Sequence, residues 1–445
     1  MKIRLDCGKA YQTFEGFGAS GAWWAQLVGG WECRDEISRL LYSKRDGIAL
    51  RTYRYNIGAG SKESGNGNID NPLRRTESFE TEGGVYDFTR DANAVYMMKQ
   101  AVADGADEVI LFVNSPIERL TKNGKSHLDP SHAFRTNLDR KNYKAFVKYC
   151  LDVTEHFVGE GVPVKYLSPI NEPVWMWTGG QEGCHYSPRQ AGRLMSMFAD
   201  EMAKRPGLDG VKLSGVESGD IRWFNKSYTR ELLRYGQTVK RLDGVDIHSY
   251  FLHVPLPFMN DRIAFLKRFR KYMDKHYPGV PVKMSEWCHM QGGRDSSMDS
   301  ALVMARVMYE DLSILNVSSW QHWIAVSEVD YCDGLIYINL DDQSYELTKR
   351  YYVTGNFSKY IPYGARRIEA ECDDKELLLL AFTDGDRTVL IVINGTQSTK
   401  QIELPAKALM AVTDESRNLA EYSDVSSTAI TPKSVNTFVL REVRV

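Results

Sequence analysis

The sequence lacks any long apolar run. No stretch of about 18 consecutive apolar residues occurs, so we expect no membrane-spanning helix and no membrane partner. The first residues, MKIRLDCGKAYQTFEG, also lack the apolar segment of a signal peptide. We therefore expect a cytoplasmic protein, or a secreted one if an export signal has been removed.

A surplus of charge of one sign is absent as well. Lys and Arg together number 56 and Asp and Glu 58, which gives a net charge of −2. Without a basic surplus, binding to nucleic acid is not expected. The length of 445 residues exceeds one ordinary core and indicates one large domain with a smaller one.

Cysteines are few and scattered. There are seven, an odd number, and no CxxC spacing occurs, so neither a disulfide framework nor a structural zinc site is expected. The neighbours Cys184-His185 and Cys288-His289 could suggest a metal site. Reduced thiols and polar loop histidines are the simpler interpretation of this spacing. We therefore expect no metal and no cofactor.

Nucleotide-binding motifs are also missing. No GxGxxG follows the first expected strand and no GxxxxGK[ST] occurs, which disfavours a nucleotide-binding open sheet. Instead, short apolar strands alternate with amphipathic helices, such as 142–158 and 301–315, over roughly the first 330 residues. The expected strands are Phe14–Ala19, Ala49–Ile57, Glu108–Asn114, Val164–Ile170, Val211–Val216, Val245–Ile247, Val280–Ser285 and Val317–Trp323.

Eight strands alternating with helices predict an α/β fold, specifically a (β/α)8 TIM barrel, with a doubly wound open sheet as the rival. After about Tyr351, strand-like runs separated by Asp-Gly-Asp and Asn-Gly-Thr turns predict an appended antiparallel β-sandwich. We expect residues 1–13 to form a strand that joins this sandwich, 14–350 the catalytic barrel and 351–445 the sandwich.

Residues just past the C-terminal ends of barrel strands form the active site. Glu172 and Glu286 follow the fourth and seventh expected strands, on opposite sides of the barrel mouth. A glycosidase needs such a pair of carboxyl groups, one to protonate the leaving oxygen and one to attack or to activate water. Other polar residues at strand ends are Arg54, Asn114, Asn171, Asp246, His248 and Tyr250.

Tryptophans gather at the same positions. Eight of the nine lie in or shortly after the C-terminal end of an expected strand, and flat indoles suit the apolar C–H faces of sugars. These eight are Trp23, Trp24, Trp175, Trp177, Trp223, Trp287, Trp320 and Trp323.

Several motifs together resemble glycoside hydrolase family 30, which belongs to a clan of retaining (β/α)8 glycosidases. They are FEGFGASGAWW, YRYNIGAG, SPINEP, DIHSY, MSEW and SSWQHW, and they span nearly the whole chain. The resemblance implies that Glu172 is the general acid/base and Glu286 the nucleophile.

The same resemblance implies roles for the neighbours of the two glutamates. Asn171 would hydrogen-bond the sugar 2-hydroxyl, and Arg54 and Tyr250 would flank Glu286. Trp323 would form the floor of the subsite at the point of cleavage, and His248 would border that subsite. The full set of expected substrate-binding residues is Trp23, Trp24, Arg54, Asn114, Asn171, Trp177, His248, Tyr250, Trp287, Trp320 and Trp323.

The stretch TGGQEGCHY and the tandem Trp23-Trp24 resemble the endo-β-1,6-galactanase branch of that family. One departure is the sequence NSPIERLTKNG, in which Ile117, Glu118 and Arg119 stand where that branch usually has aromatic residues. Glu118 or Arg119 could meet a charged or branched sugar, or form a solvated loop pair. We expect a retaining β-glycoside hydrolase that acts by double displacement on β-1,6-linked galactan or galacto-oligosaccharides.

Alternatives within the family are a β-glucosidase, β-xylosidase, β-fucosidase or β-1,6-glucanase. An alternative of another class is a non-catalytic carbohydrate-binding protein, and a metal-dependent hydrolase would need a His and Asp cluster at strand ends. The expected partner is an oligosaccharide or polysaccharide substrate. The sequence leaves the sugar, endo or exo action and the oligomeric state open.

Overall fold

The structure is a computed structural model that describes residues 1–441 except 65–68, 133, 223–224 and 257–258. The chain forms two compact units, each assembled from separate segments. The first unit comprises Met1–Gly18, Arg39–Arg51 and Trp287–Val445, and the second comprises Ala19–Ser38 and Thr52–Glu286. The expected domain boundaries after residues 13 and 350 stay a prediction.

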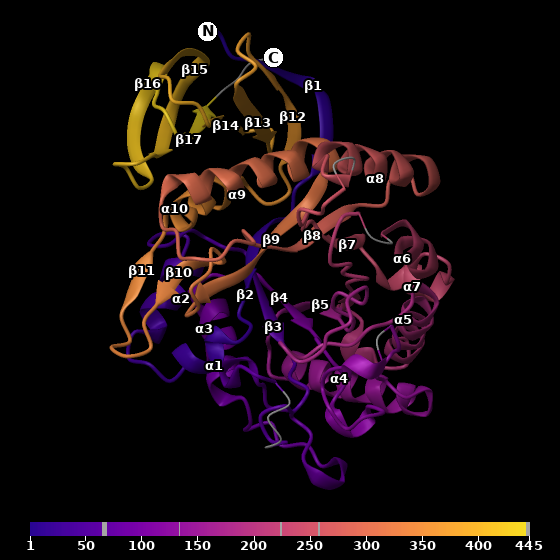
Figure 1. Cartoon of the computed structure of the whole chain (residues 1–445). Coiled ribbons are helices and arrows are strands. Elements are labelled where there is room, and N and C mark those ends of the chain that lie inside the picture. The colour runs from indigo at the N-terminus through magenta and orange to yellow at the C-terminus, as the bar shows by residue number, and fades with distance from the viewer. Residues whose placement is uncertain (65–68, 133, 223–224, 257–258, 442–445) are drawn as a thin grey trace. The chain divides into compact units, whose positions relative to one another are not determined.

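The second unit alternates parallel strands with helices (Figure 1). Its strands are β3 (Thr52–Asn56), β4 (Glu108–Phe112), β5 (Val164–Ser168), β6 (Lys212–Leu213), β7 (Val245–His248) and β8 (Val282–Trp287, whose last residue belongs to the first unit). Its α-helices are α1 (Trp24–Val28), α3 (Ala92–Asp104), α4 (Tyr143–Gly159), α5 (Pro188–Met202), α6 (Asn225–Leu232), α7 (Gly236–Arg241) and α8 (Arg262–His276).

These strands run in chain order across the sheet. β3 pairs with β4, β4 with β5 and β5 with β6, all parallel, and β7 pairs with β8 in the same sense. Single bridges, Leu213 to Leu242 and Ser218 to Ile247, connect the β6 and β7 segments. All six strand ends therefore meet at one edge, where their following residues converge.

Burial explains why these strands have no polar face. Every residue of β3, β4, β7 and β8 is buried, as expected where helices cover a parallel sheet. The polar residues within them, including Arg54 and Glu286, are therefore held in the interior and must find partners there.

Local sequence fixes the helix ends. Ser187 caps α5 by accepting from the Gln190 backbone N–H, while the Gln190 side chain accepts from the Ser187 N–H, and Pro188 occupies the first turn. The apolar spacing that predicts a helix over 142–158 is confirmed by α4, in which Phe146, Val147, Cys150, Leu151 and Phe157 are buried.

The first unit contains a seven-stranded antiparallel sheet in the order β1-β12-β13-β14-β17-β15-β16. These strands are β1 (Arg4–Thr13), β12 (Arg366–Glu371), β13 (Leu377–Thr383), β14 (Arg387–Asn394), β15 (Lys400–Thr413), β16 (Ala420–Ile430) and β17 (Ser434–Arg441). The N-terminal β1 pairs with β12, more than 350 residues later in the chain.

A shared core holds this sheet together. Apolar side chains from β12 through β17 form one buried cluster that includes Leu390, Val392 and Phe438. Two helices, α9 (Met298–Glu310) and α10 (Lys349–Ser358), contact strands β13, β15 and β17 (Figure 1). The buried Asn356 side chain of α10 donates to the Ala411 carbonyl, which ties helix to sheet.

The first unit also carries three strands outside that sheet. β9 (Val317–Ser327) pairs in parallel with β10 (Gly334–Ile338), and β11 (Tyr345–Leu347) is antiparallel to β10. Two elements, β2 (Gly16–Ser20) and α2 (Arg34–Tyr42), contain residues of both units.

Each of the eight expected strands overlaps one of β2 to β9, so the expected α/β class with a separate antiparallel sheet is confirmed. Within the described ranges, no helix has both the length and the apolar character needed to cross a membrane. All seven cysteines lie in those ranges and are free thiols.

Candidate active site

Five expected site residues of the second unit converge at the strand ends. Arg54 lies within β3, Glu172 follows β5, His248 ends β7, Tyr250 comes two residues later and Glu286 lies in β8. All five are buried, and hydrogen bonds or ion pairs link them into one cluster. The predicted convergence at one edge of the sheet is therefore observed.

Arg54 is the centre of this cluster. Its guanidinium is fully buried and donates from Nη1 to Glu286 Oε2 at 2.6 Å and from Nη2 to Glu217 Oε2 at 2.8 Å. Nη2 also donates to Asn171 Oδ1 at 3.1 Å, and the ring of Phe112 lies 3.7 Å from the guanidinium carbon. One cation thus fixes three polar side chains from three different strand ends.

Glu286 is held through both of its oxygens. Arg54 binds Oε2, and the Tyr250 hydroxyl donates to Oε1 at 3.1 Å. Donors aimed at both oxygens of a buried carboxylate fix its orientation.

Glu172 has an unusual backbone conformation. Its φ of 41° lies in the left-handed region, which an L-residue adopts only where its surroundings enforce it. Its N–H donates to the Glu217 carbonyl at 2.8 Å, and Pro173 restricts the chain that follows. At Gly219, a Cβ atom would come within 2.1 Å of Trp175 Nε1 and 2.9 Å of Glu172 Oε1, so any other residue there would displace these side chains.

The Glu172 carboxyl lies in a dry environment. Burial raises its pKa from 4.5 to about 7, although the adjacent His248 opposes the rise. His248 Nδ1 contacts Oε1 at 2.8 Å, so that oxygen accepts and the other can carry a proton. A carboxyl group with this pKa retains a proton near neutral pH.

His248 is surrounded by acids. Burial alone would lower its pKa, but Glu286, Glu172 and Glu217 outweigh burial and raise the pKa to about 10. Its Nδ1 lies 3.5 Å from Glu286 Oε1, and its Nε2 lies 3.8 Å from Glu217 Oε2. The imidazole is therefore a cation shared among three carboxyl groups.

The two expected catalytic carboxyl groups lie close together. One oxygen of Glu172, one oxygen of Glu286 and a ring nitrogen of His248 all lie within 4.8 Å of one another. A retaining glycosidase needs a short separation of this kind, whereas an inverting enzyme needs room for a water molecule.

These same three residues form the one group, within the described part of the chain, whose geometry could hold a metal ion. However, His248 Nδ1 already bonds Glu172, while Arg54 and Tyr250 donate to the oxygens of Glu286. The ring nitrogen and both carboxyl groups are thus already engaged in hydrogen bonds with other side chains of the cluster. The expectation that the protein binds no metal stays a prediction.

A chain of amides orients Asn171. Its Nδ2 donates to Asn114 Oδ1 at 2.9 Å, and Asn114 Nδ2 donates to Asn56 Oδ1 at 3.2 Å. Because Arg54 donates to Asn171 Oδ1, the amide can point only one way.

The expected tryptophans of the second unit differ in their surroundings. Trp177 is half-buried, and its Nε1 donates to the carbonyl of Glu172 at 3.1 Å, which places it beside the acid. Trp23 is buried with Arg74 over its ring, and Trp24 is fully buried with Nε1 bonded to a backbone carbonyl. Sugar contacts by all three stay a prediction.

Three further expected tryptophans belong to the first unit. Trp287 and Trp320 are buried with ring centroids 6.0 Å apart, and Trp320 Nε1 donates to Asp311 at 3.1 Å. Trp323 is buried in β9. Their roles in substrate binding stay a prediction, and Trp223 lies outside the described residues.

Sequence reasoning missed Glu217. This side chain is fully buried, and Arg54 and His248 outweigh the effect of burial and lower its pKa to about 2. It lies four residues after the two-residue strand β6, and directly after the expected strand Val211–Val216. The strand-end rule that selects Glu172 could therefore have found it.

Residues 117–119, where the galactanase branch usually has aromatic residues, pack into the protein or pair with a neighbouring loop. Ile117 is buried, and the Arg119 guanidinium forms a paired contact with Glu80, with Nη2 donating at 2.7 Å. Arg119 is thus engaged with a neighbouring loop.

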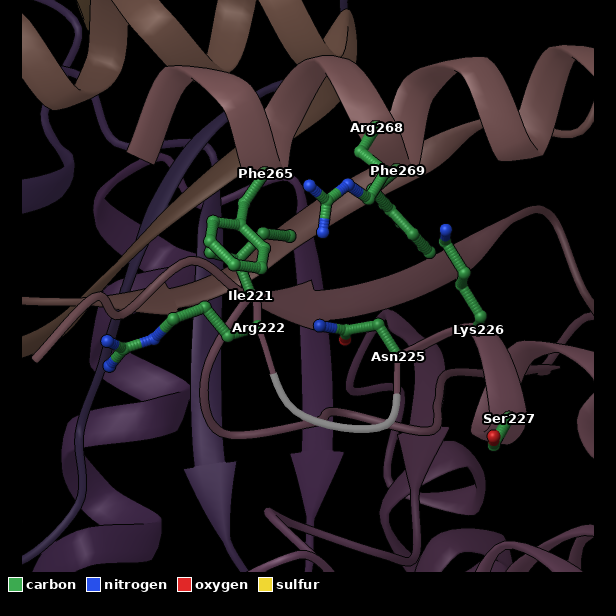
Figure 2. A pocket seen from close by; sticks show the side chains of 8 residues that line it. All are labelled: Ile221, Arg222, Asn225, Lys226, Ser227, Phe265, Arg268 and Phe269. Atoms are coloured by element: carbon green, nitrogen blue, oxygen red, sulfur yellow. The ribbon is translucent and has the colours of Figure 1, made fainter. Parts of the chain in front are cut away.

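A cavity of about 210 Å³ is lined by eight side chains (Figure 2). Asn225, Lys226 and Ser227 line it from α6, and Phe265, Arg268 and Phe269 from α8, together with Ile221 and Arg222. No residue of the Arg54 cluster lines this cavity, so it is not the candidate active site.

Comparisons with known proteins support a carbohydrate-cleaving role. The model of a family described as O-glycosyl hydrolase family 30 matches residues 1–337. An endo-β-1,6-galactanase of Hypocrea rufa is 25% identical over 395 residues, which cover 81% of this chain and 75% of that protein.

Solved structures show a similar fold. A conserved exported protein from Bacteroides fragilis has a TM-score of 0.89 at 24% identity, covering 99% of this chain and 100% of that one. The catalytic domain of GH30 xylanase C from Talaromyces cellulolyticus has a TM-score of 0.76 at 17% identity, with coverage of 99% and 100%.

Glu182, in the stretch TGGQEGCHY, is turned inward. Its carboxylate accepts from the backbone N–H groups of Ala59 and Ser61 at 3.0 and 3.2 Å. Burial raises its pKa from 4.5 to about 7 despite these donors. It therefore connects this loop to the segment that follows β3.

This buried acid predicts a pH dependence of stability. A carboxyl with a raised pKa in the folded state binds its proton more tightly there, so its contribution is present below pH 4.5 and lost as pH rises through 7. The loss is about 3 kcal/mol. In chemical denaturation, Glu182→Gln should reduce the stability difference between pH 4.5 and pH 8 by that amount.

The matched control is Glu82→Gln, which changes an exposed glutamate and should leave the pH difference unchanged. A Glu182→Gln protein with the same pH difference as the wild type would contradict the raised pKa.

Proposed function

The chain belongs to O-glycosyl hydrolase family 30 and is a glycoside hydrolase, and from this premise we propose that it cleaves β-glycosides by a retaining, double-displacement mechanism. The observation that carries the proposal is the approach of Glu172 and Glu286, whose nearest oxygens lie within 4.8 Å. This short separation is below the roughly 6.5–9.5 Å of inverting enzymes and favours direct attack on the sugar by one carboxylate.

In the first step Glu286 attacks the anomeric carbon and forms a covalent glycosyl-enzyme. Arg54 and Tyr250, which donate to its two oxygens, keep it charged and aimed. Glu172 delivers its proton to the leaving oxygen as the glycosidic bond breaks.

In the second step Glu172, now a carboxylate, removes a proton from water, which displaces Glu286 from the sugar. The His248 bond to Oε1 leaves Oε2 as the atom that carries the proton in each step. The conformation imposed by Pro173 and by φ of 41° keeps this atom in place through both steps.

Asn171 is proposed to bind the sugar 2-hydroxyl. Its NH2 group has two hydrogens, and one is donated to Asn114. The second is suited to the 2-hydroxyl, where a hydrogen bond strengthens as positive charge develops on the sugar ring.

We also propose that the protein has the expected barrel and sandwich, and that tryptophans bind the sugar. The parallel order of β3 to β6 and of β7 with β8 supports a (β/α)8 barrel, and the seven-stranded sheet with its shared core supports a β-sandwich. The half-buried Trp177, bonded to the backbone of Glu172, supports a platform beside the leaving group. Trp323 is proposed as the floor of the subsite.

The proposed substrate is a β-1,6-linked galactose chain. The Hypocrea rufa relative is an endo-β-1,6-galactanase and aligns with 81% of this chain, which supports the choice. The proposed partner is therefore an oligosaccharide or polysaccharide substrate.

The nucleophile is tested by Glu286→Gln. A neutral amide cannot form the glycosyl-enzyme, so turnover of an aryl β-glycoside should fall by roughly three or more orders of magnitude. A 2-deoxy-2-fluoro glycoside should label the wild-type peptide containing Ser285-Glu286-Trp287. Glu82→Gln serves as the control with wild-type activity, and labelling of another peptide would contradict the assignment.

The acid/base is tested by Glu172→Ala. Natural glycosides need a proton on the leaving oxygen, so their cleavage should fall about 10²- to 10⁴-fold, while dinitrophenyl glycosides should lose less in the first step. Azide should rescue turnover and yield a β-glycosyl azide. In the wild type, activity should decline as pH rises through about 7, where Glu172 loses its proton.

An α-glycosyl azide, or equal losses on both kinds of substrate, would count against an acid/base role for Glu172. An alkaline decline far from pH 7 would show that another group limits the rate.

Substrate and stereochemistry are tested together. β-1,6-Galactobiose, galactotriose and de-arabinosylated arabinogalactan should be cleaved in preference to β-1,6-glucan, β-glucosides, β-xylosides and β-fucosides. Proton NMR in the first minutes should show the β-anomer of the product, because two displacements retain configuration. Separation of products by size distinguishes endo from exo action.

An initial α-product would overturn the retaining mechanism. Cleavage of only glucosyl, xylosyl or fucosyl substrates would keep the mechanism and discard galactan. Binding of sugars without cleavage of any of them would favour a carbohydrate-binding protein.

A further inference from the structure

A third carboxylate, Glu217, lies behind the two proposed catalytic glutamates. It follows β6, its side chain is fully buried, and it accepts from Arg54 Nη2 at 2.8 Å. His248 Nε2 lies 3.8 Å from the same oxygen. The proposed mechanism assigns Glu217 no step, yet it contacts both cations of the cluster.

The backbone of Glu217 is tied to the same two strand ends. Its carbonyl accepts from the N–H of Glu172 at 2.8 Å, and a parallel bridge joins Glu217 to Asn171. The next residue, Ser218, accepts from the N–H of His248 at 3.0 Å. The segment after β6 is therefore hydrogen-bonded to both the Glu172 segment and the His248 segment, and it fixes their spacing.

We propose that Glu217 is a positioning residue for the glycosidase reaction: its carboxylate holds Arg54 in place and keeps His248 protonated and in place, so that they in turn hold Glu286 and Glu172. This inference rests on the proposed function for its catalytic consequence. Its electrostatic part concerns only the ionisation of His248.

The charges around His248 show why the third carboxylate matters. The groups that face it are Glu172 after β5, Glu217 after β6, Glu286 in β8 and Tyr250 after β7, with Arg54 from β3 bridging Glu217 and Glu286. Asp246, on β7, also interacts electrostatically with Glu217.

Two buried cations need ionised partners. Glu172 holds a proton near pH 7, so Glu286 and Glu217 are left to balance Arg54 and His248. If Glu217 were neutral, one cation would be uncompensated in a dry site. Arg54 cannot lose its proton, so the loss of a neighbouring carboxylate acts on His248 and lowers the His248 pKa.

The test measures the His248 pKa by NMR in the wild type, Glu217→Gln and Glu217→Asp proteins, with histidine labelled at a ring carbon. The His248 resonance is assigned by its loss in His248→Gln. Wild-type His248 should remain protonated at pH 8. In Glu217→Gln its pKa should fall, and kcat should drop roughly 10- to 100-fold, the scale of a lost hydrogen bond to a charged group. Glu217→Asp, which keeps the charge, should keep His248 protonated.

Glu182→Gln is the matched control, because this substitution also removes a buried carboxyl group from the second unit. The Glu182 carboxylate accepts from the N–H groups of Ala59 and Ser61, which lie outside the Arg54 cluster. It should leave the His248 titration unchanged. A purely structural role for Glu217 would alter folding without moving the His248 pKa selectively.

A wild-type His248 that titrates near 6.5 would overturn the inference even if Glu217→Gln fails to fold. A folded Glu217→Gln protein with wild-type kcat and an unchanged His248 titration would also overturn it. The titration requires no substrate, so it remains decisive if the galactan assignment or the proposed mechanism fails in the activity assays.

Discussion

The buried ion pairs of Arg54 are the interaction on which the active site depends. A guanidinium with no solvent exposure is stable only if its hydrogens find acceptors, and Glu286, Glu217 and Asn171 supply them. Removing one partner of such a pair leaves an uncompensated charge in the interior, which is far costlier than losing a surface pair. The positions of these acceptors are therefore strongly coupled.

The buried charges give chemically identical side chains different pKa values. Glu217, beside two cations, has a pKa lowered to about 2, whereas burial dominates at Glu172 and raises its pKa to about 7. One glutamate stays charged and another keeps a proton, although both lie close to His248. Opposite shifts in neighbouring acids are what acid/base chemistry near neutral pH requires.

Backbone constraints keep this arrangement from relaxing. The left-handed conformation of Glu172, the bond from its N–H to Glu217 and the close approach of Gly219 leave the acid little freedom. The amide chain through Asn171 and Asn114 sets the orientation of a donor on the other side of Arg54. Preorganised groups of this kind need no rearrangement when charge develops during reaction.

Local sequence determined the eight strands and the helices between them, because apolar periodicity and turn residues act over short distances. It also located Arg54, Glu172, His248 and Glu286, since residues after parallel strands must share one edge of a sheet. Only the tertiary structure decided which groups meet there: Glu217 as the second partner of Arg54, and Glu182 turned inward onto the backbone of residues 59 and 61. Burial and the distance between charges from distant segments set these partnerships and pKa shifts, and no local pattern encodes them.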